Sequence, residues 1–178
     1  MKEISIDEIY LNELNNENDW TNLSENYKLT EEIIDKFADK VNWKYISIYQ
    51  ELSESFIEKF QDKVNWTYIS EHQNLSENFI EKYKDKINWI RISYSQKLSN
   101  EFIEKYSKKV DWILISQFQK LSESFITKFK DKVDWKLISK YQMLSENFII
   151  EFEDKVDWIS IFSYQKLSNE FKEKYKRK

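Results

Sequence analysis

Apolar and polar residues follow one another along this chain with the spacing of short amphipathic helices. In the segment Leu52–Asn74, Ile57, Phe60 and Val64 lie one, four and eight positions after Phe56. An α-helix places residues at these spacings on one side, where they can be buried together. The pattern predicts an amphipathic helix of about 11 residues, which we call helix A.

A second, shorter helix is expected in the same segment. Ser53 stands where it can cap helix A, and Asn65 stands where it can cap a helix that begins at Trp66. Ser and Asn are preferred at this position because their side chains accept a hydrogen bond from the first free amides. We call this second helix, of about 8 residues, helix B.

The two-helix pattern recurs along the whole chain. Consecutive tryptophans are always 23 residues apart, at Trp20, Trp43, Trp66, Trp89, Trp112, Trp135 and Trp158. Such a period is typical of a solenoid, in which each unit buries its apolar side against its neighbours. The sequence therefore predicts an all-α solenoid of 23-residue two-helix repeats, with about seven and a half units.

The end units differ from the internal ones. Asp7 stands in place of the Ser cap in the first unit, and Lys172 replaces the buried Ile in the last. Polar end units protect the exposed ends of a solenoid from association. We expect one solenoid domain over 1–178, with an N-terminal capping unit (1–28), six regular units (29–166) and a C-terminal capping half unit (167–178).

Composition removes several classes of function. The chain has no Gly, Pro or Cys and a single His, His72, and it carries 28 basic against 32 acidic residues. Disulfides, thiolate catalysis and Cys/His zinc sites are excluded, and no phosphate-binding Gly-rich loop is present. We predict no enzyme activity, no catalytic residue, no metal site and no cofactor.

The same features bear on localisation. No apolar run approaches the roughly 20 residues that a membrane-spanning helix needs. The first residues lack the apolar core of a signal peptide. We therefore expect a cytoplasmic protein, in the producing or host cell, that does not contact a membrane.

The surfaces of the two helices differ. On helix A, nearly all outward positions are polar or charged, with exceptions such as Ala38 and Ile150, whereas on helix B nine of the 21 positions one, two and five residues after each Trp are Ile, Leu or Tyr. An exposed apolar surface often marks an interaction site. The predicted partner-binding residues are Tyr45, Ile48, Tyr68, Ile90, Arg91, Tyr94, Ile113, Leu114, Leu137 and Ile159. The alternative is that neighbouring helices bury these side chains.

Two further ladders of residues are expected to serve the fold. The tryptophans, each at the start of a helix, are interpreted as core packing rather than as a platform for sugars or bases. A glutamine recurs seven residues after Trp43 and each later Trp, and we expect it to hydrogen-bond the backbone at the tight turns. His72 occupies the place of Tyr49 or Phe118 in other units and is interpreted as a packing variant.

The main functional hypothesis is a protein-binding scaffold or adapter, and two alternatives remain. Helical repeats can read nucleic acids, but the lysines alternate with acids on helix A instead of forming a stripe of one sign. Residues 1–35 carry two basic against ten acidic residues, and 36–178 carry 26 against 22. An acidic head and a basic tail could join copies end to end as a homo-oligomer.

The repeat also resembles a known kind of protein. The run Leu75–Trp89, LSENFIEKYKDKINW, is similar to the short tandem repeats of uncharacterised proteins from giant DNA viruses of amoebae, and the likeness covers nearly the whole chain. The abundance of Lys, Asn and Ile is also typical of AT-rich genomes, including low-GC bacteria and their phages. The resemblance implies a viral or phage protein that binds a host factor.

Overall fold

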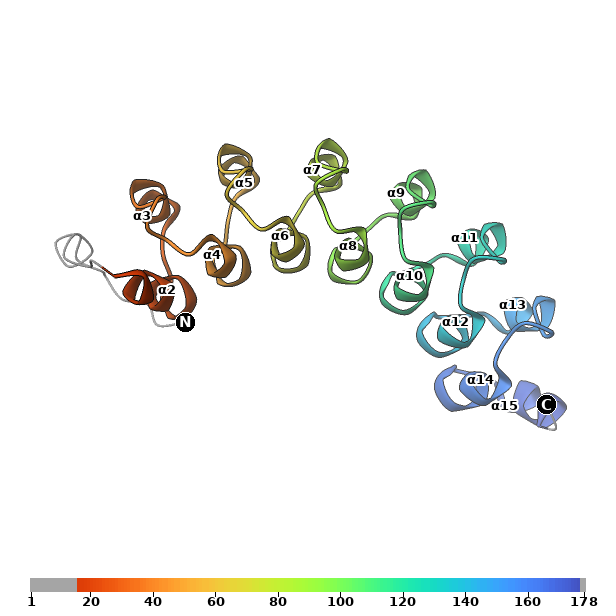
Figure 1. Ribbon diagram of the computed structural model, residues 1–178. Coiled ribbons are helices and arrows are strands. Elements are labelled where there is room, and N and C mark those ends of the chain that lie inside the picture. The colour runs from red at the N-terminus through yellow and green to blue at the C-terminus, as the bar shows by residue number, and fades with distance from the viewer. Residues whose placement is uncertain (1–15, 177–178) are drawn as a thin grey trace. The chain divides into compact units, whose positions relative to one another are not determined.

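The computed structural model describes residues 16–176, and all regular structure within them is helical (Figure 1). The helices alternate between the two predicted kinds. The helices that contain or begin at a tryptophan are α2 (Glu17–Asn26), α4 (Trp43–Tyr49), α6 (Trp66–His72), α8 (Trp89–Ser95), α10 (Trp112–Phe118), α12 (Trp135–Tyr141) and α14 (Trp158–Tyr164). Helices A are α3 (Glu31–Lys36), α5 (Glu54–Lys59), α7 (Glu77–Lys82), α9 (Asn100–Lys105), α11 (Glu123–Lys128), α13 (Glu146–Glu151) and α15 (Asn169–Tyr175). This regular series of helix pairs confirms the predicted all-α solenoid class.

Helix A is shorter than the expected 11 residues. In α5 the Ser53 hydroxyl accepts from Phe56 N at 3.2 Å, and the helix ends after six residues at Phe60, whose φ is −110° and ψ is 29°. A separate turn follows, in which Val64 N donates to Phe60 O at 3.0 Å. Because this bond also spans four residues, the apolar period continues through the break. For this reason the sequence pattern predicted one continuous helix, where the structure has a six-residue helix followed by a separate turn.

Helix B begins and ends as its caps require. In α6 the Asn65 side chain accepts from Thr67 N at 3.1 Å and from Tyr68 N at 3.3 Å. The helix ends after seven residues at Gln73, whose N–H donates to Ile69 O. Seven residues are too few for a stable isolated helix in water, so tertiary packing has to stabilise helix B.

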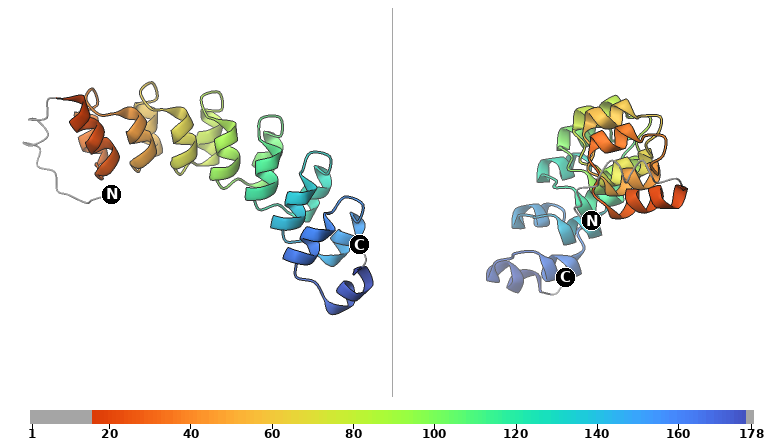
Figure 2. Two further views of the ribbon diagram at one scale, coloured as in Figure 1. Left: turned by 60° about the horizontal axis from the view of Figure 1, so that its bottom comes forward. Right: turned by 90° about the vertical axis from the view of Figure 1, so that its left-hand side faces the viewer.

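The chain divides into two compact units, Met1–Asn88 and Trp89–Lys178, and each is described by itself. Within each unit the helices B pack directly against one another and form one row, while the helices A form a second row beside it (Figures 1 and 2). The prediction of a single domain over 1–178 stays a prediction. The predicted cap at Asp7 lies outside the described residues.

The core lies between the two rows. The Ile three residues after each Trp in α4–α14 is completely buried, as is an Ile of helix A such as Ile57 or Ile126. Burying an Ile side chain contributes about 1.5–3 kcal/mol, and the repeat supplies two per unit. The end units depart from this regularity. Trp20 is the fourth residue of α2 instead of the first, and Phe162 in α14 replaces the serine found in the other helices B.

Across residues 16–176, no helix is both long enough and apolar enough to cross a bilayer.

Candidate binding surface on the helix B row

Buried glutamines join each repeat to the one before it. Gln119 donates from Nε2 to Ser93 O at 2.9 Å and to Gln96 O at 2.8 Å, and its Oε1 accepts from Leu98 N at 3.0 Å. Gln119 is only 5% exposed. Water therefore cannot take its place as the hydrogen-bond partner of these three buried backbone groups. Equivalent bonds to the preceding repeat are made by Gln50, Gln73, Gln142 and Gln165. These glutamines therefore hold the loops between helices B and A, which is the task predicted for them.

A buried serine connects successive helices B. Ser116 donates to Trp112 O at 2.7 Å within its own helix and accepts from Asp134 N, before the next helix B, at 2.9 Å. The pattern recurs at Ser24, Ser47, Ser70, Ser93 and Ser139. Phe162 stands at this position in α14 and has no hydroxyl to offer. Serine and glutamine together fix the spacing of the helix B row.

The tryptophan rings are engaged within the protein. Trp112 donates from Nε1 to Ser107 O at 3.0 Å, and its ring lies 6.2 Å from Phe125 and 5.0 Å from Phe129 in the following helix A. The ammonium of Lys132 lies 5.5 Å from the same ring. In this arrangement the tryptophan joins two repeats, and little of its face is left for a base or a sugar.

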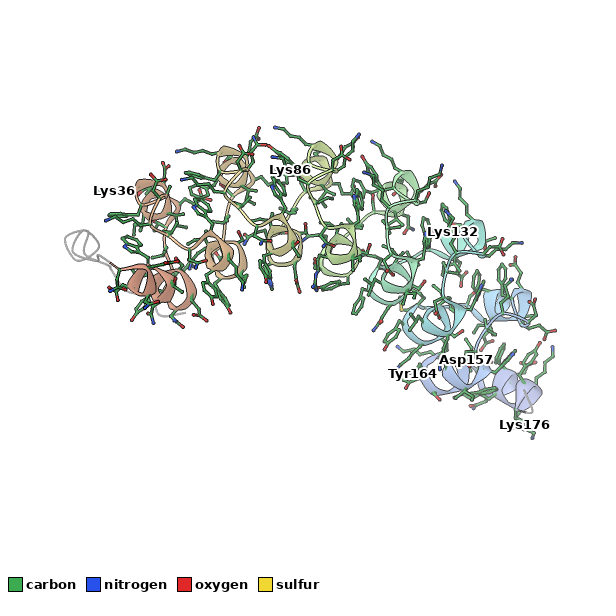
Figure 3. The ribbon with its side chains drawn as sticks, viewed as in Figure 1. Lys36, Lys86, Lys132, Asp157, Tyr164 and Lys176 are labelled. Atoms are coloured by element: carbon green, nitrogen blue, oxygen red, sulfur yellow. The ribbon has the colours of Figure 1, made fainter. Side chains whose placement is uncertain are left out.

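The outer surface of the helix A row is charged. Ion pairs join equivalent positions of successive helices A, as between Lys59 and Asp35 at 2.6 Å and between Lys128 and Glu104. The hydrogen bond from Lys63 lowers the pKa of Asp39 below its usual value. Figure 3 shows Lys36 and Lys86 on the helix A side of the first unit and Lys132 on the helix A side of the second. On this surface the charged side chains pair with one another, and few apolar groups are exposed.

The opposite surface belongs to helix B. We define the helix B face as the side chains one, two, five and six positions after each Trp. At the first position, Ile90, Ile113 and Ile159 are 57%, 59% and 80% exposed. The other predicted contact residues, namely Tyr45, Ile48, Tyr68, Arg91, Tyr94, Leu114 and Leu137, are half-buried. Both interpretations of these residues, as an exposed contact surface and as side chains covered by neighbouring helices, therefore apply in part. The second and fifth positions are partly covered by neighbouring helices, while the first position faces outward.

The sixth position after each Trp was not among the predicted contact residues, although it lies on the same surface. Tyr49, Phe118, Tyr141 and Tyr164 stand there with 40–58% exposure. His72, interpreted as a packing variant, is also exposed. At 100° per residue the sixth position is only 40° from the second, and this angle could have revealed it. Figure 3 places Tyr164 on the side of α14 away from the helix A row.

The exposed apolar side chains gather on this face in the second unit. Of the large hydrophobic residues described as exposed, only Ile150 belongs to helix A; Met143, 84% exposed, lies in the loop after α12. A shallow pocket of about 330 Å³ opens between the ends of α10 and α12, where Phe118, Lys120, Tyr141 and Met143 line it. Gln117, Gln119 and Gln142 also line it, so its walls combine apolar and polar groups.

Cations are placed among these apolar groups. The ammonium of Lys140 lies 5.0 Å from the ring of Tyr141 and 5.1 Å from that of Tyr164, and a hydrogen bond to Tyr141 raises its pKa. The Arg91 guanidinium donates to the Tyr94 hydroxyl at 3.0 Å. Both cations are therefore held at the surface by aromatic neighbours.

Within residues 16–176, no group of three or more His, Asp or Glu side chains is positioned to hold a metal ion. His72 Nε2 lies 3.9 Å from a carboxylate oxygen of Glu71.

Comparisons of the chain with protein-family models, with curated proteins and with solved structures found no match.

Proposed function

We propose that this protein is a non-enzymatic scaffold or adapter that binds another protein through its helix B face. The observation that carries the proposal is the distribution of exposed apolar side chains. Ile90, Ile113, Phe118 and Tyr141 all stand on this face, and each is at least 45% exposed. Contiguous apolar groups on a folded surface are typical of protein-binding sites.

The rigidity of the support favours the same function. The side chains at the contact positions extend from helices whose spacing is fixed by buried glutamine and serine bonds, as at Gln119 and Ser116. A surface that is already in its bound arrangement loses less conformational entropy when a partner docks. The contact residues also differ from unit to unit, whereas the supporting residues recur in the internal repeats, which allows selectivity on a nearly constant frame.

A capture experiment with matched variants tests the proposal. In one variant, Ile90, Ile113, Phe118 and Tyr141 are changed together to Ser; in the control, Glu101, Lys108, Lys130 and Ile150, all exposed on helix A or its turn, are changed to Ser. We expect a protein from the producing cells to be retained by the wild type and the control and lost from the first variant. Retention by all three would contradict the proposal.

A further inference from the structure

Resting on the proposed function, we infer that the helix B face of the second unit recognises an acidic peptide segment that carries aliphatic or aromatic side chains. The observation behind this inference is that every charged side chain on that face is basic. On the helix B face of Trp89–Lys178 the charged residues are Arg91, Lys136 and Lys140. The loop position eight residues after each Trp, which we call the rim, adds Lys97, Lys120 and Lys166.

The carboxylates nearest to this face are engaged in helix capping. Asp111 accepts from Leu114 N at 3.0 Å, Asp134 accepts from Leu137 N at 2.9 Å, and Asp157 accepts from Ser160 N at 2.9 Å. These bonds compensate part of the negative charge at the start of each helix B. The six cations of the face and the rim outnumber these three carboxylates, of which Asp157 interacts electrostatically with Lys136.

The first unit provides an internal comparison. The corresponding positions of Met1–Asn88 hold both signs, with Lys44 against Glu71 on the face and Lys28 paired with Glu51 at the rim, 3.8 Å apart. Over the whole sequence, residues 1–88 carry 10 basic against 19 acidic residues, while 89–178 carry 18 against 13. Among residues 16–176, the second unit alone combines an exposed apolar row with a single sign of charge.

The pocket shows how both properties act together. Phe118, Tyr141 and Met143 can receive an apolar side chain, and Lys120 stands on the same wall. A carboxylate next to the inserted side chain would meet this ammonium and that of Lys140. Opposite charges around an apolar contact speed association and reject partners of the wrong sign.

The same cations could be expected to attract a nucleic acid, but the apolar groups favour a peptide. Single-stranded nucleic acids bind basic grooves by stacking bases on aromatic rings. The side chains of Ile90, Ile113 and Ile159 are each more than half exposed, and an aliphatic side chain cannot stack on a base. Their burial is favourable against aliphatic or aromatic side chains.

Selection from a random library of 15-residue peptides, with the full chain as bait, tests the inference without presupposing a sequence. We expect the enriched peptides to be acidic and to contain Leu, Ile or an aromatic residue. Their affinity should fall about tenfold or more when Lys97, Lys120 and Lys136 are changed to Glu, because three favourable charge pairs become unfavourable. Changing Lys108, Lys130 and Lys172 to Glu, on the helix A side, should change affinity less than about twofold.

Each contrary result has its own meaning. Enriched peptides that are neutral or basic, but still depend on Ile113 and Phe118, would overturn the acidic chemistry and leave the proposed function standing. If no peptide depended on these side chains, both would fail. Tighter binding of a labelled 20-nucleotide uridine strand would assign the face to nucleic acid instead. Self-association in sedimentation, abolished by the three Lys→Glu changes, would assign it to a second copy.

Discussion

The two rows of helices share one 23-residue period but present opposite surfaces. The outer side of the helix A row is covered by charged residues that pair between repeats, as Lys128 does with Glu104. The helix B row exposes Ile113, Phe118 and Lys136. Since both rows bury equivalent Ile residues completely, folding alone does not explain the difference.

This contrast separates structural positions from surface positions. The Gln, Ser and buried Ile of helix B recur in the internal repeats and make contacts within the protein, whereas the residues one, two, five and six positions after Trp change from repeat to repeat. A substitution at the first kind of position should therefore lower stability, and one at the second kind should leave it nearly unchanged. The following predictions test this separation, beginning with the largest effect.

The clearest test lies within α10, where Ile115 is completely buried and Ile113 is 59% exposed. We expect Ile115→Ala to lower the free energy of unfolding by about 4 kcal/mol, because it leaves a cavity in the core. The control, Ile113→Ala, should change it by less than about 0.5 kcal/mol. Urea unfolding followed by circular dichroism measures both. Equal losses would show that the exposed row belongs to the core.

The glutamine ladder should be nearly as sensitive. Gln119→Leu removes the partners of Ser93 O, Gln96 O and Leu98 N while keeping a similar volume, and we expect a loss of about 3 kcal/mol. Gln117→Leu, two residues away on the helix B face, should cost less than about 0.5 kcal/mol. A small effect at Gln119 would mean that water replaces the lost bonds.

The cap of α14 should make stability depend on pH. Hydrogen bonds from the Ser160 hydroxyl and N–H, together with the charge of Lys136, lower the pKa of Asp157. This lowered pKa favours the folded state at any pH above the unfolded pKa of about 3.9, and the contribution disappears as pH falls through the folded pKa. We expect Asp157→Ala to lower stability at pH 7 by about 1 kcal/mol.

Asp157→Asn is the matched control for this prediction, because Asn caps a helix without titrating there. Its unfolding free energy, compared with that of the wild type between pH 2 and pH 7, should lack the part of the acid dependence that comes from Asp157. Identical pH profiles for the two proteins would contradict this assignment.

The smallest effect is expected on the helix A surface. In a double-mutant cycle of Lys128→Ala and Glu104→Ala, we expect a coupling of about 0.5 kcal/mol or less at 0.1 M salt, because both side chains are about half exposed. The coupling should vanish in 1 M salt. A value above about 2 kcal/mol would show that the ion pairs, and not only the buried positions, hold the repeats together.

Much of this architecture could be predicted from the sequence because it depends on local, repeated chemistry. The Trp period gave the helix pairs, and Ser53 and Asn65 were identified correctly as caps. The break at Phe60 was missed because the turn after it preserves the four-residue hydrogen bond.

The surface was predicted less completely. Ile90, Ile113 and Ile159 were among the predicted contact residues and are exposed, whereas Phe118 and Tyr141 are also exposed but were not among those residues. A helical wheel treats each helix alone and does not show which side its neighbours cover. That depends on the spacing of the rows, which is fixed by contacts between repeats such as the bonds of Gln119.

The most direct test of the account is the free energy of unfolding of the variant in which Ile90, Ile113, Phe118 and Tyr141 are all changed to Ser. If these apolar side chains serve a partner and not the fold, the value should lie within about 1 kcal/mol of that of the wild type. A loss of more than about 4 kcal/mol would show that they stabilise the fold itself, and the division between a structural interior and a binding face would be wrong.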